Sequence, residues 1–205
     1  MWIFGGGGVA LSGVAVAFWG WFCVLPIVLT VFVFYFFRDP ERKAPDGPRL
    51  LVAPADGRIT EIAEVDEESL GGKAQRVSIF LSVFDVHVNR SPCSGCVESV
   101  EYHRGTFVNA MKAESARVNE RSELVLESDE VPGLRVLVRQ VAGLIARRIV
   151  CDAAPGRKFA RGERFGMIKF GSRTDVCVPA GRLTDIRVKV GDHVSGGKTV
   201  IGAIQ

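Results

Sequence analysis

Hydrophobic and polar positions divide the chain into an apolar beginning and a longer part made of short alternating runs. No charged side chain precedes Arg38, and residues 9–37 exceed the roughly 20 apolar residues that cross a bilayer. Further on, β-branched residues recur in short runs separated by glycine, which is typical of strands and tight turns. The pattern predicts a membrane-associating segment, residues 1–37, followed by one mainly β domain, residues 38–205, with few short helices.

The apolar segment is unlike a secretory signal peptide, because no basic region precedes it and no small-residue cleavage site follows it. Pro26 divides the segment, which leaves open one kinked helix or a shallow re-entrant hairpin. Arg38, Arg42 and Lys43 follow at once. By the positive-inside tendency, we expect the domain on the cytoplasmic side of the cell membrane.

The domain begins with a proline-rich linker and continues as strands joined by glycine turns. "LLVAPADGRITEI" predicts strand, turn and strand, and "AQRVSIFLSVFDVHVNRSP" is the strongest buried strand. "GTFVNAMKAESARVNERSEL" alone has a helix-like composition, whereas "LRVLVRQVAGLIARRIV" predicts two more strands. "APADGRITEI" and "VKVGDHVSGGKTVIG" resemble the half-motifs of barrel-sandwich domains, so we expect a β-sandwich or barrel-sandwich-like architecture.

The formal charge of +3 hides a basic stretch, since eight basic residues stand against two acidic ones between Arg147 and Arg173. Beside a membrane segment this favours contact with anionic lipid headgroups, and an ordinary solvated face is the alternative. No motif with interleaved aromatic residues indicates nucleic-acid binding. Cys93 and Cys96 form a C-x-x-C without a second ligand pair, which favours a turn over a zinc or redox site. We therefore predict no metal.

The chain has three histidines, which differ in context. His193 lies in a glycine-rich turn, where a solvated structural role is favoured, and His103 is ambiguous. His87 ends a buried strand and is flanked by Asp85 and Arg90, which suits a titrating group. A satisfied core histidine is the alternative for His87.

The stretch "RFGMIKFGSRTDVCVP", residues 164–179, alternates like a strand with an interruption in its middle. Gly171 is that interruption, and a glycine inside a strand usually marks a bulge or a close backbone approach. Ser172 follows it on the apolar face. The predicted members of that face are Ile168, Phe170, Ser172, Thr174, Val176 and Val178.

Ser172 lies in the wrong local context for a hydrolase, whose serine sits on a sharp strand-to-helix turn, commonly G-x-S-x-G. A different chemistry fits Gly171-Ser172 in a strained strand: the hydroxyl attacks the carbonyl of its own preceding peptide bond while a base takes the proton. The resulting ester breaks by β-elimination, and residue 172 becomes a pyruvoyl group. This ketone forms a Schiff base with an amine and draws electrons from the α-carbon.

Five motifs cover essentially the whole chain in order: "PADGRI", "SIFLSVFDVHVNRSP", "GTFVNAMKAESARVNER", "RFGMIKFGSRTDVCVP" and "VKVGDHVSGGKTVIG". Together with the apolar N-terminus ending near "FFRDPER", they resemble the shorter bacterial and archaeal type of phosphatidylserine decarboxylase proenzyme. The resemblance implies a pyruvoyl-dependent carboxy-lyase of phospholipid biosynthesis. Such an enzyme converts phosphatidylserine to phosphatidylethanolamine and carbon dioxide at the membrane.

Carried over by position, the resemblance implies cleavage between Gly171 and Ser172. The products would be a β chain, residues 1–171, and an α chain, residues 172–205, which stay associated. Ser172 would become the covalent pyruvoyl cofactor at the start of the α chain.

The resemblance also assigns the acid and base residues. Asp56 matches an aspartate that, in the longer type, supports the histidine acting on the serine, and His87 matches the histidine of decarboxylation. Arg90 departs from the longer type, which has the self-cleavage base there, because arginine cannot act as a base. Self-cleavage then relies on His87 for both steps, on His103, or on strain with Asp56, and we favour His87.

The substrate carboxylate is expected near the apolar face, where desolvation favours loss of carbon dioxide. Phe170, Arg164 and Lys169 are the candidate substrate-binding residues, and Arg164, Lys169 or Arg173 would hold the lipid phosphate. A membrane-anchored barrel-sandwich adaptor without catalysis is the alternative function, and a pyruvoyl decarboxylase for a soluble amino acid is a second rival. The sequence leaves homo-oligomerisation open.

Overall fold

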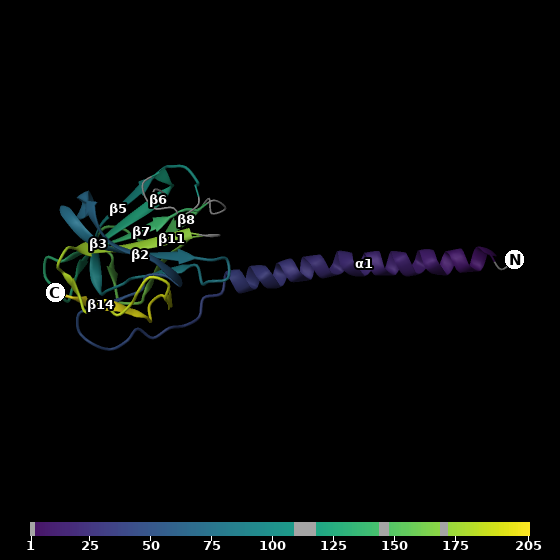
Figure 1. The fold of residues 1–205 in the computed structure, drawn as a ribbon, viewed down its shortest axis with the longest axis horizontal. Coiled ribbons are helices and arrows are strands. Elements are labelled where there is room, and N and C mark those ends of the chain that lie inside the picture. Colours follow the sequence, from purple (N-terminus) through teal and green to yellow (C-terminus); the bar gives the residue numbers. More distant parts are fainter. Residues whose placement is uncertain (1–2, 109–117, 144–147, 169–171) are drawn as a thin grey trace. The chain divides into compact units, whose positions relative to one another are not determined.

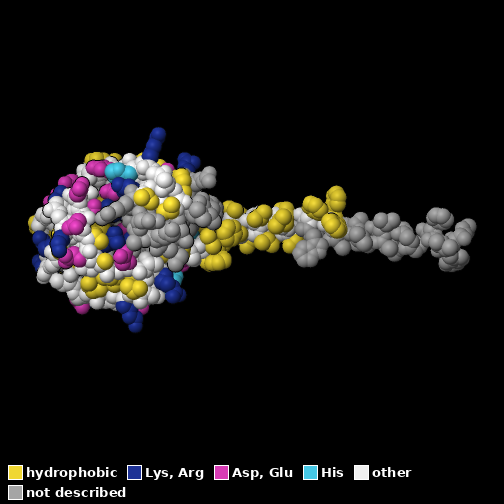
Figure 2. All heavy atoms as spheres, turned by 45° about the horizontal axis from the view of Figure 1, so that its top comes forward, with side chains coloured by type: hydrophobic (Ala, Val, Ile, Leu, Met, Phe, Trp, Pro, Cys, Tyr) yellow, Lys and Arg dark blue, Asp and Glu magenta, His cyan; other side chains and the backbone are white. Residues whose placement is uncertain are grey.

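The computed structural model describes residues 3–108, 118–143, 148–168 and 172–205, and it divides into two units, Met1–Arg38 and Asp39–Gln205. The first unit is one helix, α1 (Ile3–Phe36), with Pro26 inside it, so the hairpin alternative is wrong. Its stretch Phe18–Phe36 has a mean hydropathy of 2.0 and is long and apolar enough to cross a membrane. Figure 2 shows the exposed hydrophobic side chains along the described part of this helix.

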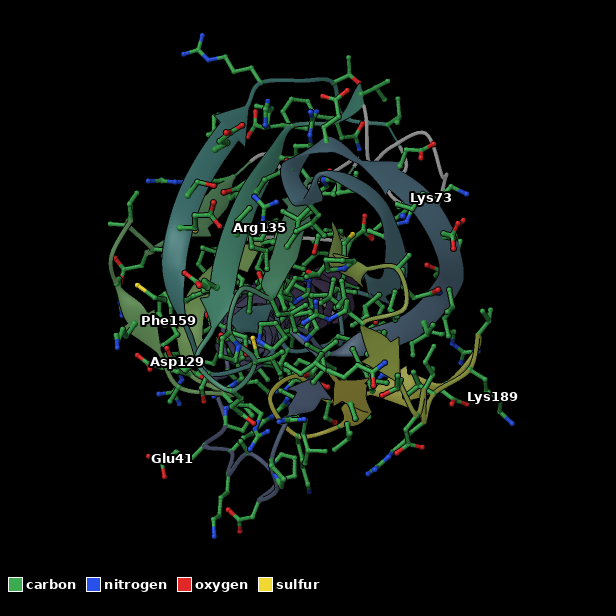
Figure 3. The ribbon with its side chains drawn as sticks, turned by 90° about the vertical axis from the view of Figure 1, so that its left-hand side faces the viewer. Glu41, Lys73, Asp129, Arg135, Phe159 and Lys189 are labelled. Carbon is green, nitrogen blue, oxygen red and sulfur yellow. The ribbon has the colours of Figure 1, made fainter. Side chains whose placement is uncertain are left out.

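The second unit is mainly β, as predicted, and its largest sheet curls around a core filled with side chains (Figures 1 and 3). In spatial order this sheet contains β13 (His193–Val194), β2 (Gly57–Glu67), β3 (Gly72–Leu81), β11 (Ser172–Pro179), β7 (Arg135–Val141), β6 (Arg121–Ser128), β5 (Gly95–His103) and β9 (Lys158–Phe159). A short 3₁₀ helix, η1 (Glu68–Leu70), joins β2 to β3.

The described residues of the domain also form two three-stranded sheets. One has the order β4 (Val88–Arg90), β10 (Arg164–Ile168) and β8 (Ile149–Cys151). The other has the order β1 (Leu50–Val52), β14 (Val200–Ile204) and β12 (Leu183–Thr184). In the described part of the chain, each pairing between these named strands is antiparallel.

The stretch 164–179 is two strands rather than one interrupted strand, and that part of the prediction is wrong. β10 pairs with β4 and β8, whereas β11 pairs with β3 and β7. Ile168 and Ser172 therefore belong to different sheets. Within β11 the predicted alternation holds, since Val176 packs in the main apolar cluster and Cys177 in a separate one.

The polar residues of β11 alternate onto the face that carries Cys177, so the sequence predicts that this is the more polar face. In the structure this face is buried, and its charged residues form ion pairs. Arg173 donates from Nε to Asp175 over 2.6 Å. On the neighbouring strand, Arg139 binds both carboxylate oxygens of Glu67 and also Glu123, over 2.8–2.9 Å. Both faces of this central strand are thus enclosed, which is possible because the charges on the polar face are paired.

The middle of the segment with helix-like composition, residues 109–117, lies outside the described residues, so a helix there stays a prediction, whereas the end of the segment, from Arg121, belongs to strand β6. At its flank, buried Asn119 donates to the backbone oxygens of Val108 and Ala142 over 2.8 and 2.7 Å. This amide links Val108 to Ala142, directly after β7.

Candidate functional site

Ser172 opens β11 beside Leu81, the last residue of β3. Its side chain is fully buried, and its Oγ has no hydrogen-bond partner among the described residues. Leaving a buried hydroxyl unpaired costs about 1–3 kcal/mol. Such an atom calls for an explanation, and a reactive role is one. Gly171, Phe170 and Lys169, which we also predicted as site residues, lie outside the described residues.

His87 is fully buried and lies where β10 ends. Its backbone oxygen accepts from the backbone nitrogen of Ile168 over 3.2 Å. Because Ile168 is four residues before Ser172, the chain allows at most about 14 Å between their Cα atoms. Nδ1 of His87 is 2.9 Å from the backbone oxygen of Asp85. That oxygen only accepts, so Nδ1 carries the proton and Nε2 is the basic nitrogen of the neutral ring.

Asp85 and His193 support the turn that carries His87. The Asp85 carboxylate accepts from the backbone nitrogen and Oγ of Ser82 over 2.7 Å, and its Oδ1 is 2.9 Å from Nε2 of His193. Burial raises the pKa of Asp85, but the bonds from Ser82 and His193 outweigh it and the pKa is lowered overall. His193 is 58% exposed and therefore solvated, as expected, and its contact with Asp85 fixes the turn next to His87.

Asp56 is buried, and its carboxylate binds Arg42 and the backbone nitrogen of Gly196 rather than a histidine among the described residues. The Arg42 Nη2 to Asp56 Oδ2 distance is 2.7 Å, and the Gly196 contact is 2.8 Å. Gly57 follows with φ 144°, where a side chain would meet the backbone oxygen of Phe80 at 2.1 Å. The "PADG" turn therefore needs its glycine, and it fixes Asp56 between the linker and the C-terminal segment.

Arg90 stands at the position where the longer type has a histidine, and it binds the linker and a neighbouring turn. It is 4% exposed, and it binds Asp39 over 2.8 Å and the backbone oxygen of Gly162 over 3.1 Å. Burial lowers its pKa, and the neighbouring Arg164 and Arg42 add to the shift. Arg90 thus helps to fasten the linker to the domain.

Arg164 and Arg173 have different surroundings. Arg164 is half exposed, binds Asp39 over 2.6 Å, and lines a cleft of about 810 Å³. The other basic residues of this cleft are Arg42, Lys43, Arg90 and Arg161. Figure 3 shows Glu41, which also lines the cleft, on the linker at the edge of the domain. Arg173 is fully buried and bound to Asp175, so the hypothesis that it contacts a lipid phosphate is wrong.

His103 lies at the end of β5, where its Nε2 is 3.5 Å from Glu101 and 3.9 Å from Glu123. The cross-strand register places it three strands from Arg173 in β11. At about 4.8 Å per strand this is about 14 Å. His103 is therefore poorly placed to act on Ser172.

The C-x-x-C pair lies at a bend that leads into β5. Burial raises the pKa of the Cys93 thiol to about 12, and both thiols are free. Within the described ranges, no group of three His, Cys, Asp or Glu residues is arranged to hold a metal ion.

Comparison with known proteins decides the family of this chain. The family model described as phosphatidylserine decarboxylase matches residues 29–202. The chain belongs to the phosphatidylserine decarboxylase family. It is 50% identical over 205 residues to the phosphatidylserine decarboxylase proenzyme of Symbiobacterium thermophilum, covering 99% of this chain and 93% of that relative. The proenzymes of Rhodopirellula baltica and Chlorobium limicola are 44% identical, over 96% and 87% of this chain and 82% of each relative.

Resemblance to the phosphatidylserine decarboxylase family pointed to Ser172, His87 and Asp56 from the sequence, but not to the side chains that surround them. Asp85 and His193 are 108 residues apart, and nothing in either motif indicates their pairing. Buried Gln140 had one signal: it is an amide inside the strand run "LRVLVRQV".

Proposed function

We propose that this chain is a proenzyme that cleaves itself between Gly171 and Ser172. The product would convert phosphatidylserine to phosphatidylethanolamine and carbon dioxide. The observation that carries this proposal is the fully buried Ser172 hydroxyl, which has no hydrogen-bond partner among the described residues, in a chain of this family. The change of sheet between β10 and β11 adds support, because the bond to be cleaved lies between two separately held strands.

In the proposed cleavage, Oγ of Ser172 attacks the carbonyl carbon of Gly171 and His87 accepts the hydroxyl proton. The bond between Gly171 and the nitrogen of residue 172 breaks, that nitrogen takes back the proton from His87, and an ester is left. Elimination frees the Gly171 carboxylate and leaves dehydroalanine at 172. Hydrolysis then releases ammonia and leaves the pyruvoyl group.

The surroundings of residue 172 fit a pyruvoyl group. Leu81 beside it and Val176 on the same strand face are apolar and buried, which would shield a ketone from water. Once formed, the group supplies an electrophilic carbonyl that binds the substrate amine and withdraws electrons from its α-carbon.

The two chains would stay associated through contacts on both sides of the cleavage point. β11, in the α chain, pairs with β3 and β7 of the β chain. The backbone of Gly196 also binds Asp56 and Arg42. We assign Asp56 a positioning role through these two partners.

His87 is the proposed acid and base of both steps. Its protonated Nδ1 is held by the Asp85 backbone, which leaves Nε2 to take the Ser172 proton and later to deliver a proton to the substrate α-carbon. Arg164, half exposed in its cleft, is the proposed contact for the lipid phosphate. Phe170 and Lys169 stay predictions at the same site.

We infer that α1 anchors the enzyme in the cell membrane with the domain on the cytoplasmic side. The support is the length and hydropathy of Phe18–Phe36, together with Arg38, Arg42 and Lys43 directly after the helix. A lipid substrate would then be available in the same membrane.

The test uses the full chain in detergent with phosphatidylserine labelled at its carboxyl carbon. The wild type and Ser128→Ala, a buried serine on β6, should release all of the label as carbon dioxide and give unlabelled phosphatidylethanolamine. Ser172→Ala should give neither. Release of carbon dioxide from free serine would instead indicate a decarboxylase for a soluble amino acid. A wild type that releases no carbon dioxide from either substrate would favour the adaptor without catalysis.

A further inference from the structure

The inner face of the large sheet changes from apolar to polar close to Ser172. Val176 and its cross-strand partner Val138 are buried and apolar. The next pair along, Thr174 and Gln140, is polar and equally buried. Buried polar side chains inside an apolar face need partners.

Thr174 and Gln140 find part of their partners in the three-stranded sheet that covers this end. Asn89 on β4 donates from Nδ2 to Oγ1 of Thr174 over 3.1 Å. Gln140 donates from Nε2 to Oδ1 of Asn89 over 2.8 Å and to the backbone oxygen of Val150 over 3.3 Å. Gly166 on β10 makes room, since a Cβ there would lie 3.0 Å from the Gln140 nitrogen.

These contacts distinguish the nitrogen of the Gln140 amide from its oxygen. The backbone oxygen of Val150 can only accept, so the group facing it is the amide nitrogen. Both hydrogens of that nitrogen are then used. The carbonyl oxygen Oε1 is buried and has no hydrogen-bond partner among the described residues.

Gln140 is a diagonal neighbour of Ser172. It lies directly opposite Thr174, and Ser172 is two residues before Thr174 on the same face of β11. Diagonal neighbours have Cα atoms about 7–8 Å apart, within reach of a long side chain. The two unpaired buried oxygens, Ser172 Oγ and Gln140 Oε1, thus belong to adjacent positions in the sheet.

We propose that Gln140 is a specificity-determining residue whose Oε1 accepts a hydrogen bond from the primary amine of the substrate headgroup. The proposal rests on the proposed function and adds the feature of the substrate that is recognised. A primary amine offers N–H donors, which the choline nitrogen lacks. A neutral acceptor also suits the reaction, because a carboxylate here would favour the protonated amine, which has no lone pair to react.

The experiment measures product inhibition of the processed full-length enzyme in mixed micelles. Short-chain phosphatidylethanolamine and phosphatidylcholine are the two inhibitors, and they differ in their N–H donors. In the wild type, phosphatidylethanolamine should inhibit more strongly. Gln140→Met keeps the length of the side chain but has no carbonyl acceptor. It should raise the inhibition constant of phosphatidylethanolamine, and the KM for phosphatidylserine, at least about 10-fold, with that of phosphatidylcholine unchanged.

Val138→Ala is the matched control, because it loosens the same face of β7 without removing an acceptor. It should leave the ratio of the two inhibition constants at the wild-type value. Gln140→Glu keeps an acceptor, so it should retain strong inhibition by phosphatidylethanolamine even if Gln140→Met is processed poorly.

The outcomes separate the two proposals. A wild type that makes no phosphatidylethanolamine overturns the proposed function. An active wild type whose inhibitor ratio survives Gln140→Met overturns only the role of Gln140. A ratio lost equally in Gln140→Met, Gln140→Glu and Val138→Ala also overturns it, since packing alone would then explain the effect.

Discussion

The two faces of β11 are both buried, but one holds charged groups in ion pairs and the other holds neutral polar groups. On one face Arg173 is paired with Asp175, and the adjacent Arg139 is paired with Glu67 and Glu123. On the other face the Ser172 hydroxyl has no partner among the described residues, and neither has the Gln140 carbonyl oxygen. The charged side chains of the first face meet opposite charges, although Oδ2 of Asp175 has no hydrogen-bond partner among the described residues. The neutral oxygens of Ser172 and Gln140 on the second face have hydrogen-bonding capacity left for chemistry.

The contrast shows that burial alone does not separate structural from reactive polar residues in this domain. What differs is whether a charged or polar group meets its complement inside the fold. The inner face of β11 carries Ser172 and Thr174, and its outer face carries Arg173 and Asp175. Changes on the inner face should therefore affect reaction rates, and changes on the outer face should affect the stability of the fold.

The largest effect is expected from His87→Gln, which removes the proposed base. Loss of a general acid–base group should slow both self-cleavage and decarboxylation by about 10²–10⁴-fold. Gel time courses of processing and carbon dioxide release measure the two steps. His103→Gln is the control and should cleave itself normally. Normal cleavage of His87→Gln together with slow cleavage of His103→Gln would identify His103 as the base.

Arg139→Leu should have the largest effect on stability, because it leaves buried Glu67 without its counter-charge and leaves Glu123 with Arg121 alone. Removing one partner of a buried ion pair typically costs about 3–5 kcal/mol. Denaturant unfolding of the Ser172→Ala protein, with and without this change, measures the loss in a single uncut chain. A loss below about 1 kcal/mol would mean that the outer-face network contributes little to the fold.

The pH dependence of stability should report the same network. Burial raises the pKa of Glu123, but Arg139 and Arg121 outweigh it and lower the pKa below its ordinary value of 4.5. A depressed carboxyl pKa adds stability above pH 4.5, and this stability is lost as the pH falls through the lower folded value. Thermal unfolding should show Glu123→Gln less stable than its parent near pH 7, with the gap closing below about pH 4.5. A gap that stays constant would contradict the ion-pair assignment.

The smallest effect is expected from Arg164→Gln, since this side chain is half exposed and already paired with Asp39. The KM for phosphatidylserine should rise about 2–5-fold with kcat unchanged, as expected for an exposed charge contact worth less than about 1 kcal/mol. Lys189→Gln, an exposed lysine on the C-terminal loop (Figure 3), should leave the KM unchanged. Equal shifts in both variants would indicate a general charge effect.

The sequence predicted those features that rest on local pattern or on whole motifs. The apolar helix, the mainly β domain and the family follow from hydropathy, period-two alternation and five ordered motifs. The alternation of β11 also holds. The sequence did not predict that the strand ends at Ile168, because the period-two pattern continues through Gly171. The strands on either side, β10 and β11, nevertheless pair with different partners.

The partners of the site residues were beyond the sequence because they are distant along the chain. Arg42 reaches Asp56 across the linker, and Gly196 reaches Asp56 from 140 residues away. No spacing rule connects these positions. The same holds for Gln140 and Asn89, whose amides meet only because two sheets pack together.

The central claim is that Ser172 converts itself into the reactive group, and the intact mass of the purified full-length chain tests it most directly. We predict two chains, residues 1–171 and 172–205, with the smaller one lighter by the mass of ammonia than a fragment that begins with serine. Ser172→Ala should give a single uncut chain. An uncut wild type, or a small chain that keeps an N-terminal serine, would contradict the account.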